Sequence, residues 1–282
     1  MTDLVLLCTL PAERASLAAV VVAAGGTPVI DLTASARVAV PADAWVRVRS
    51  RRSVPGTGPV VLVAGADASS PVRNRETWLE VTVPQAAPEG FAGIVLRGVE
   101  AGGPCGAAPG LELLASVPQG TRVMLDSGVD PAEAAAAAGL GAEGVVLSDV
   151  LLGLDALGLP PRLSSRLQSL EPASLHVVNG YRLVASPLSP VLRRLLGGAS
   201  FWELAQGWLE ADDPAGRVWP GGTALTRARA LAAAHADIPG LLAAYRQEAP
   251  VPAGVARPPA PARVATAADG HRDDAVAIIG LG

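Results

Sequence analysis

The sequence predicts an α/β fold, a compact (β/α)8 barrel of the TIM type followed by a C-terminal helical extension. Short apolar runs alternate with helical or turn segments, as in β/α units around a parallel sheet. Several runs, such as residues 60–63, are apolar throughout, which is typical of strands buried on both faces. A barrel of this type has about 250 residues. Eight strands before residue 150 therefore imply that several outer helices are short or absent, so the barrel is degenerate.

The expected strands are residues 4–9, 28–32, 45–49, 60–64, 78–83, 93–96, 122–125 and 144–147. Residues 13–24 are expected to form a helix that ends at the Gly25-Gly26 pair. Residues 131–140 carry the clearest helix signals. Asp130 is a good N-cap, Pro131 takes the first helical position, and an alanine run follows.

The pattern changes after Leu154. We expect a hairpin or short strand pair at 175–185 and amphipathic helices at 190–196 and 201–210. One or two helices at 223–247 should break near Pro239-Gly240, and residues 249–272 are Pro/Ala-rich and read as an extended tether. The predicted domains are a barrel at 1–158, a helical extension packing on it at 159–248, and a linker at 249–272.

Composition limits the classes of function. A net charge of −4 and a pI of about 5.4 argue against a nucleic-acid surface. The densest basic patch alternates along one segment and fits the solvated face of a strand: Arg47, Arg49, Arg51 and Arg52. No uncharged run is long enough to span a membrane, and the N-terminus does not resemble a secretory signal peptide, so a cytoplasmic location is expected. The lack of lysine, with abundant Ala, Gly and Pro, suggests a GC-rich bacterial genome.

Metal-binding and nucleophilic motifs are missing from the sequence. The two cysteines and three histidines have no metal-ligand spacing: Cys8, Cys105, His176, His235 and His271. There is no Gly-x-Ser-x-Gly elbow, P-loop or His-Glu-x-x-His. Cys105 follows a glycine-rich turn and could face a pocket, but we interpret it as a reduced, packed residue.

Residues 93–106 form the most informative motif, an apolar strand ending in Glu100-Ala-Gly-Gly-Pro-Cys-Gly. It resembles the turn of the nitronate monooxygenase family and of the flavin-dependent enoyl reductases of polyunsaturated fatty acid synthases. In those proteins the catalytic histidine follows Glu-Ala-Gly-Gly, whereas this chain has Pro104. Proline cannot accept a proton, so no residue is assigned as catalytic, and Glu100 is interpreted as structural, capping backbone amides.

The resemblance also implies a site for FMN, whose phosphate the family holds on the turns after the seventh and eighth strands. The implied cofactor-binding residues are Gly102, Gly103, Ser127, Gly128 and Ser148. Asp149, however, places a carboxylate where the phosphate should lie, at a cost of about 1–4 kcal/mol. The sequence therefore makes FMN binding doubtful.

Residues 273–282, Asp-Asp-Ala-Val-Ala-Ile-Ile-Gly-Leu-Gly, resemble the opening strand of a ketosynthase domain in type I polyketide and fatty acid synthases. The resemblance implies the N-terminal region of such a synthase, with the adjacent ketosynthase domain and an acyl carrier protein as partners and dimerisation through the synthase. Nucleic acid and membrane are not expected partners. The expected role is structural or docking. Two alternatives remain open: an active FMN-dependent enoyl reductase or nitronate monooxygenase, and an unrelated α/β domain.

Overall fold

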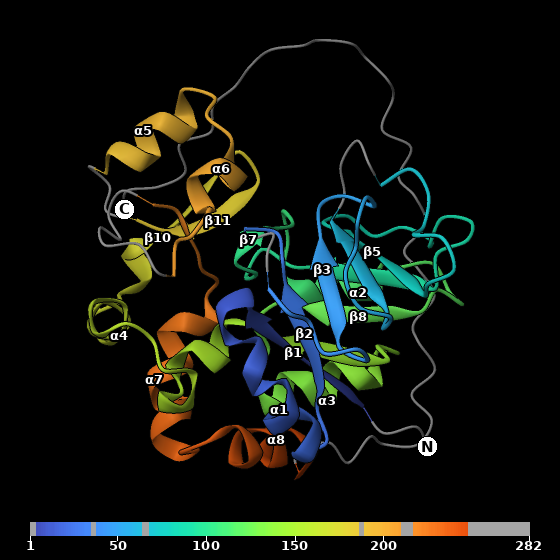
Figure 1. The fold of residues 1–282 in the computed structure, drawn as a ribbon, viewed down its shortest axis with the longest axis horizontal. Coiled ribbons are helices and arrows are strands. Elements are labelled where there is room, and N and C mark those ends of the chain that lie inside the picture. Colours follow the sequence, from blue (N-terminus) through green and yellow to red (C-terminus); the bar gives the residue numbers. More distant parts are fainter. Residues whose placement is uncertain (1–3, 35–37, 64–67, 186–188, 210–216, 248–282) are drawn as a thin grey trace.

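The computed structural model describes residues 4–34, 38–63, 68–185, 189–209 and 217–247. Eight parallel strands close into a barrel in the order β1-β2-β3-β4-β5-β6-β8-β9, with β1 paired to β9 (Figure 1). The strands are β1 Val5–Pro11, β2 Thr27–Asp31, β3 Trp45–Val48, β4 Val60–Val63, β5 Thr77–Val81, β6 Gly93–Arg97, β8 Val123–Asp126 and β9 Gly144–Leu147. The predicted (β/α)8 barrel is confirmed, and each of its strands overlaps an expected one.

Alternation along the strands divides their side chains between two apolar clusters. The inward cluster is centred on Leu7, Val29, Val61, Trp78, Val95, Met124 and Val146. The neighbouring residues, such as Leu6, Val46 and Leu62, point outward into the larger core between barrel and helices. Because both faces are buried, the strands read as continuous apolar runs in the sequence.

Few helices cover the barrel in the described residues. A 3-10 turn, Ala12–Leu17, leads into α1 (Ala18–Ala23), and α2 (Gly110–Ala115) precedes β8. The longer α3 (Pro131–Gly139) starts with the expected cap: the Asp130 carboxylate accepts the N–H of Glu133 at 2.8 Å, and the Glu133 carboxylate accepts that of Asp130 at 2.8 Å. No α-helix joins β2 through β6 where the structure describes those connections, so the shortened outer layer is as expected.

A second unit follows β9. Its elements are two 3-10 turns (Asp149–Gly153 and Asp155–Leu157), α4 (Pro161–Gln168), a turn at Pro172–Ser174, β10 (Leu175–Val178), β11 (Tyr181–Val184), α5 (Pro190–Leu196), α6 (Phe201–Ala205) and β12 (Trp219–Pro220). Strand β11 pairs antiparallel with β10, with β12 and with β7 (Gly103–Pro104), which lies in the turn after β6. This sheet joins the second unit to the barrel (Figure 1).

The hairpin at 175–185 and the helix at 190–196 form as expected. The helix predicted at 201–210 is shorter and ends at Ala205. The predicted break near Pro239-Gly240 is confirmed and lies just before this pair: α7 (Ala224–Ala234) ends at Ala234 and α8 (Ile238–Gln247) starts at Ile238. Pro239 therefore lies in the first turn of α8, where its missing N–H has no helical partner to lose.

Helix α8 returns to the barrel and packs against α1 and α3. Its buried Tyr245 hydroxyl donates to the Val129 carbonyl at 2.7 Å, in the loop after β8. The predicted linker at 249–272 and the ketosynthase-like strand at 273–282 lie outside the described residues. Among the described helices, none has the length and apolarity required to cross a bilayer.

Candidate functional site

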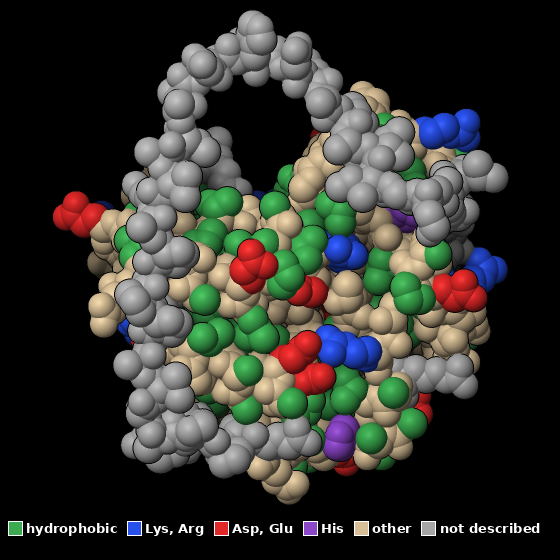
Figure 2. All heavy atoms as spheres, turned by 180° about the vertical axis from the view of Figure 1, so that it is seen from behind, with side chains coloured by type: hydrophobic (Ala, Val, Ile, Leu, Met, Phe, Trp, Pro, Cys, Tyr) green, Lys and Arg blue, Asp and Glu red, His purple; other side chains and the backbone are tan. Residues whose placement is uncertain are grey.

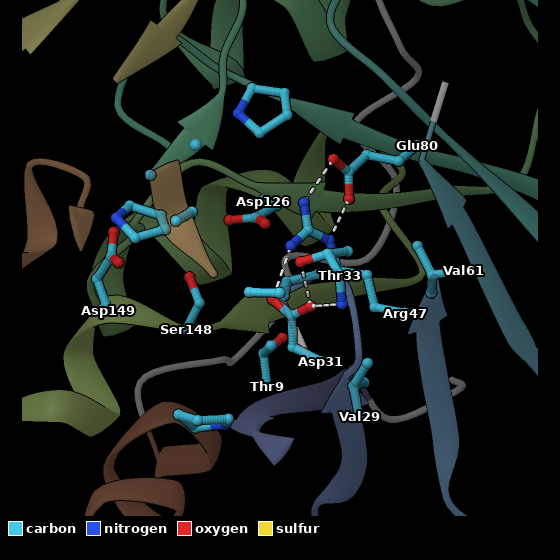
Figure 3. A pocket seen from close by; sticks show the side chains of 18 of the residues that line it. Thr9, Val29, Asp31, Thr33, Arg47, Val61, Glu80, Asp126, Ser148 and Asp149 are labelled. Atoms are coloured by element: carbon cyan, nitrogen blue, oxygen red, sulfur yellow. Dashed lines mark hydrogen bonds and ion pairs between the residues drawn. The ribbon is translucent and has the colours of Figure 1, made fainter. Parts of the chain in front are cut away.

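Polar side chains gather at the carboxyl ends of the barrel strands, above the apolar inward cluster. Six of the eight strands each contribute one polar side chain to the lining of a cavity: Thr9, Asp31, Arg47, Glu80, Arg97 and Asp126. Ser148, directly after β9, lines it as well, and all of these residues except Arg97 are labelled in Figure 3. Trp202, Gly207, Trp208 and Pro220 of the second unit line it as well. Active sites of (β/α)8 barrels form at this end, so the cavity is the candidate site.

Ion pairs occupy much of the barrel mouth. The Arg47 guanidinium binds Glu80 through two N–H groups, at 2.6 and 2.8 Å, and donates a third to Asp31 at 2.8 Å. The other Asp31 oxygen accepts the backbone N–H and the hydroxyl of Thr33, at 2.9 and 2.6 Å. Arg47 also lies 5.9 Å from the centre of the Trp202 ring.

Arg47 therefore corrects the sequence interpretation of the basic patch. Arg49, Arg51 and Arg52 are exposed as expected, but Arg47 is 9% exposed and faces the barrel interior. The reason is that successive side chains of a strand point to opposite faces. On β3, Trp45 and Arg47 point inward, whereas Val46 and Val48 point outward into the core.

Arg97 on β6 forms the second half of the network. Its guanidinium donates to the Asp126 carboxylate, to the Gly102 carbonyl and, at 2.6 Å, to the Pro104 carbonyl, and it lies 3.5 Å from Glu80. All three guanidinium nitrogens of Arg97 are thus bonded, two of them to the glycine turn. Arg97 holds that turn against the barrel.

The network leaves one carboxylate incompletely paired. Glu80 is bonded on both oxygens, and although burial would raise its pKa, Arg47 and then Arg97 hold it below its usual range. Asp126 is 2% exposed and pairs with Arg97 only through Oδ2; its Oδ1 has no partner among the described residues. Burial, assisted by Glu80, raises the pKa of Asp126.

Asp149 lies at the edge of the same cavity, directly after β9. Its buried carboxylate accepts the backbone N–H of Gly222 at 2.8 Å. Burial, together with the nearby Asp126 carboxylate, raises the pKa of Asp149 to about 7, although the Gly222 bond opposes the shift. The sequence placed this acid in the cofactor region, and the structure shows that it binds the turn before α7.

The glycine turn packs closely on that same segment. A Cβ atom on Gly102 would lie 2.8–2.9 Å from the backbone of Gly221 and Gly222, closer than real contacts allow. The Thr223 N–H donates to the Glu100 carbonyl at 2.8 Å, which fixes the two turns together. Gly102 is therefore required for the approach of two backbone segments.

The five predicted cofactor-binding residues are separated by the fold. Gly102, Gly103 and Ser148 line the cavity. Ser127 instead packs against the start of α2, where a Cβ atom on Gly110 would overlap its side chain. Gly128, at φ +61°, lies against Ala224, outside the cavity lining.

The remaining candidate groups have structural roles. The Glu100 carboxylate accepts the N–H of Gly110 at the start of α2 at 3.1 Å, in agreement with the capping interpretation. Both cysteines are buried and free; burial raises the pKa of Cys105, and that of Cys8 to about 12. The described residues contain no cluster of ligands suited to a metal ion.

Sequence reasoning missed most of the polar layer, namely Asp31, Glu80, Arg97 and Asp126, and the two tryptophans. A signal was present. Each of these four charged residues lies within an expected strand or directly after one, two positions beyond an inward-facing apolar residue. The tryptophans come from the second unit, whose position relative to the barrel has no local signature.

The sequence matches no model of a known protein family, and no curated protein gives a significant match. Solved structures do match. FabK from Thermotoga maritima has a TM-score of 0.66 at 15% identity, over 88% of this chain and 93% of FabK. A variant of that FabK gives 0.58 at 15% identity, over 79% and 86%. Nitroalkane oxidase from Streptomyces ansochromogenes gives 0.62 at 17% identity, over 88% and 97%. This chain therefore shares the eight-stranded barrel fold of FabK and nitroalkane oxidase.

Proposed function

We propose that this chain is a catalytically degenerate barrel of the nitronate monooxygenase type, which holds no FMN and serves as a structural or docking domain of a polyketide or fatty acid synthase. The observation that carries the proposal is the filling of the barrel mouth by side chains of the chain itself.

The phosphate region does not suit a phosphate. The Gly222 amide, which belongs to the turn packed on the glycine motif, already donates to Asp149. Above pH 7, where Asp149 is ionised, a phosphate beside this carboxylate would meet a repulsion of about 1–4 kcal/mol. Gly128 and Ser127, the expected contacts after the seventh strand, do not line the cavity.

The cavity is also small for a flavin. Its volume is about 90 Å³, whereas cofactor and ligand pockets usually enclose about 300–1,000 Å³. Enlarging it would require the Arg47–Glu80 and Arg97–Asp126 pairs to separate inside the protein. Breaking a buried ion pair is strongly unfavourable. The residues present therefore do not fit FMN.

No side chain of the glycine turn replaces the missing histidine. Pro104 has no ionisable group, Glu100 is engaged with the N-terminus of α2, and burial favours the protonated thiol of Cys105. A general base must reach its proton at hydrogen-bond distance with a suitable pKa. This combination favours a scaffold over an oxidoreductase.

The proposed partners are the adjacent ketosynthase domain of the same chain and an acyl carrier protein, with dimerisation through the synthase. The resemblance of residues 273–282 to a ketosynthase strand supports this class. The second unit has its own apolar core, centred on Leu183, Leu192 and Phe201, which gives a docking domain a defined shape. Among the described residues in Figure 2, acidic and basic side chains lie interspersed, without a broad patch of one charge.

The test is an FMN titration of the purified full chain, followed by flavin fluorescence and visible absorption. We expect no saturable binding. Stoichiometric binding would overturn the proposal. The variant Asp149→Ala, which frees the Gly222 amide, separates the two causes: if it alone binds FMN, the phosphate region is the obstacle, and if neither binds, the filled mouth is. Light scattering of the same samples measures the expected dimer.

The structural likeness to FabK and nitroalkane oxidase favours a second candidate, an active FMN-dependent enoyl reductase or nitronate monooxygenase. In that case Gly103 and Ser148 would be the cavity residues nearest to the cofactor role. Turnover of an enoyl thioester or a nitronate by the full chain, dependent on added FMN, distinguishes it from the scaffold.

A further inference from the structure

The charges that line the barrel cavity do not balance. Five acids face it, Glu13, Asp31, Glu80, Asp126 and Asp149, against two arginines, Arg47 and Arg97. An excess of carboxylates in a partly closed cavity creates a negative potential that attracts cations.

The arginines are not available to an anion. Every guanidinium nitrogen of Arg47 donates to Asp31 or Glu80. Every one of Arg97 donates to Asp126 or to a carbonyl of the glycine turn. A carboxylate or phosphate ligand would have to displace an existing ion pair.

One acceptor, in contrast, lacks a donor. Asp126 Oδ1 has no hydrogen-bond partner among the described residues, although the side chain is 2% exposed. A buried acceptor left unpaired costs about 1–3 kcal/mol, and more when it is charged. In Figure 3 its carboxylate extends toward the side of the cavity where Ser148 and Asp149 lie. A bound donor at this position would satisfy Oδ1.

Aromatic rings of the second unit also line the cavity. Trp202 already accommodates two cations, with the guanidinium carbons of Arg47 and Arg49 at 5.9 and 5.4 Å from its centre. Trp208 stacks on Trp219, with ring centres 5.6 Å apart, and also lines the cavity. Indole faces attract ammonium groups and pack well on short alkyl chains.

We propose that this cavity binds a small organic ammonium ion. The ammonium group donates to Asp126 Oδ1 and to the Asp149 carboxylate, and the carbon chain packs beside Trp208. The volume of about 90 Å³ suits one small organic molecule or a few waters. The inference rests on the proposed function, because a bound flavin would compete for the same space.

Isothermal titration of the full chain tests the inference, above pH 7 so that Asp149 is ionised. The probe is ethanolamine, with acetate, propanol and potassium chloride as comparisons. We expect saturable binding of ethanolamine alone. Loss of a hydrogen bond to a charged acceptor weakens binding by about 10- to 100-fold, which is the expected effect of Asp149→Asn and of Asp126→Asn.

The matched control is Asp43→Asn. Asp43 is an exposed acid that precedes β3 at the opposite end of the barrel, so this variant changes net charge by the same amount and should leave affinity within about twofold. If Asp126→Asn fails to fold, the test is the affinity of Asp149→Asn and Trp208→Leu for ethanolamine, which should be weaker than that of the parent chain.

Absence of ethanolamine binding, equal binding of acetate or potassium, or equal weakening by Asp43→Asn would overturn the inference. The FMN titration is a separate measurement, so failure of the scaffold proposal can be distinguished from failure of the ammonium site. If the chain binds neither FMN nor ethanolamine, the scaffold proposal is supported and the ammonium site is refuted.

Discussion

Replacing Arg47 by methionine should strongly destabilise the barrel. Arg47 and Glu80 are 10% and 2% exposed in their side chains, and Glu80 would keep only the 3.5 Å contact with Arg97. Removing one partner of a buried pair costs about 3–5 kcal/mol, since the other charge remains buried. At about 2–4 °C per kcal/mol for domains of this size, Tm should fall by roughly 6–20 °C.

Thermal unfolding followed by circular dichroism measures this effect. The double variant Arg47→Met/Glu80→Leu removes both charges and should regain at least about 2 kcal/mol over the single variant, because well-packed apolar groups replace a buried pair with little loss. Arg122→Met is the control. Arg122 pairs with Glu143 at 2.8 Å, but both side chains are well exposed, 50% and 38%, so its loss should cost about 1 kcal/mol.

Equal shifts for Arg47→Met and Arg122→Met would refute the reasoning. Such a result would mean that water reaches the barrel mouth and screens the network. A double variant less stable than Arg47→Met would show instead that the Glu80 carboxylate is held by groups other than Arg47, Arg97 being the nearest.

Three further predictions concern Asp149, the paired turns and the α3 cap. Burial raises the pKa of Asp149 to about 7, so between about pH 4 and 7 the folded state binds a proton that the unfolded chain has lost, and stability falls as pH rises through this window. Asp149→Asn should flatten that dependence in urea unfolding at several pH values; an unchanged profile would contradict the shift. A Cβ atom on Gly222 would overlap Asp149 and the Glu100 carbonyl, so Gly222→Ala should cost about 1–3 kcal/mol. The control is Gly139→Ala, which has open space around the new methyl group and should be neutral or stabilising by up to about 1 kcal/mol. Equal Tm values for Gly222→Ala and Gly139→Ala would argue against close packing at Gly222. Asp130→Ala should cost about 1 kcal/mol through loss of the cap, whereas a Tm within error of the parent would show that the cap contributes nothing.

The sequence allowed the barrel to be predicted because its local signals agree with its tertiary structure. Strands buried on both faces produce continuous apolar runs, and Asp130 with Pro131 marks a helix start regardless of what packs around it. In the small sheet joining the barrel to the second unit, only the β10–β11 hairpin had such a signal. Strands β7 and β12 have two residues each, too few for any periodicity.

The site was harder to predict because it depends on the direction in which each side chain points. Arg47 and Arg49 are two positions apart, yet one is buried in an ion network and the other is exposed, since β3 ends between them at Val48. Asp149 was recognised as incompatible with a phosphate, but its partner Gly222 is distant in sequence. Contacts of this kind follow from chain topology and leave no trace in local spacing.

The pairing of β1 with β9 has a consequence for synthesis of the chain. Val5 lies opposite Gly144, about 140 residues later, and ribosomes add about 5–20 residues per second. The first strand therefore waits about 7–28 seconds, with one edge lacking its final neighbour, before the ring can close. Its apolar faces, with buried Leu6, Leu7 and Cys8, make this interval the time when the nascent chain most needs protection from aggregation.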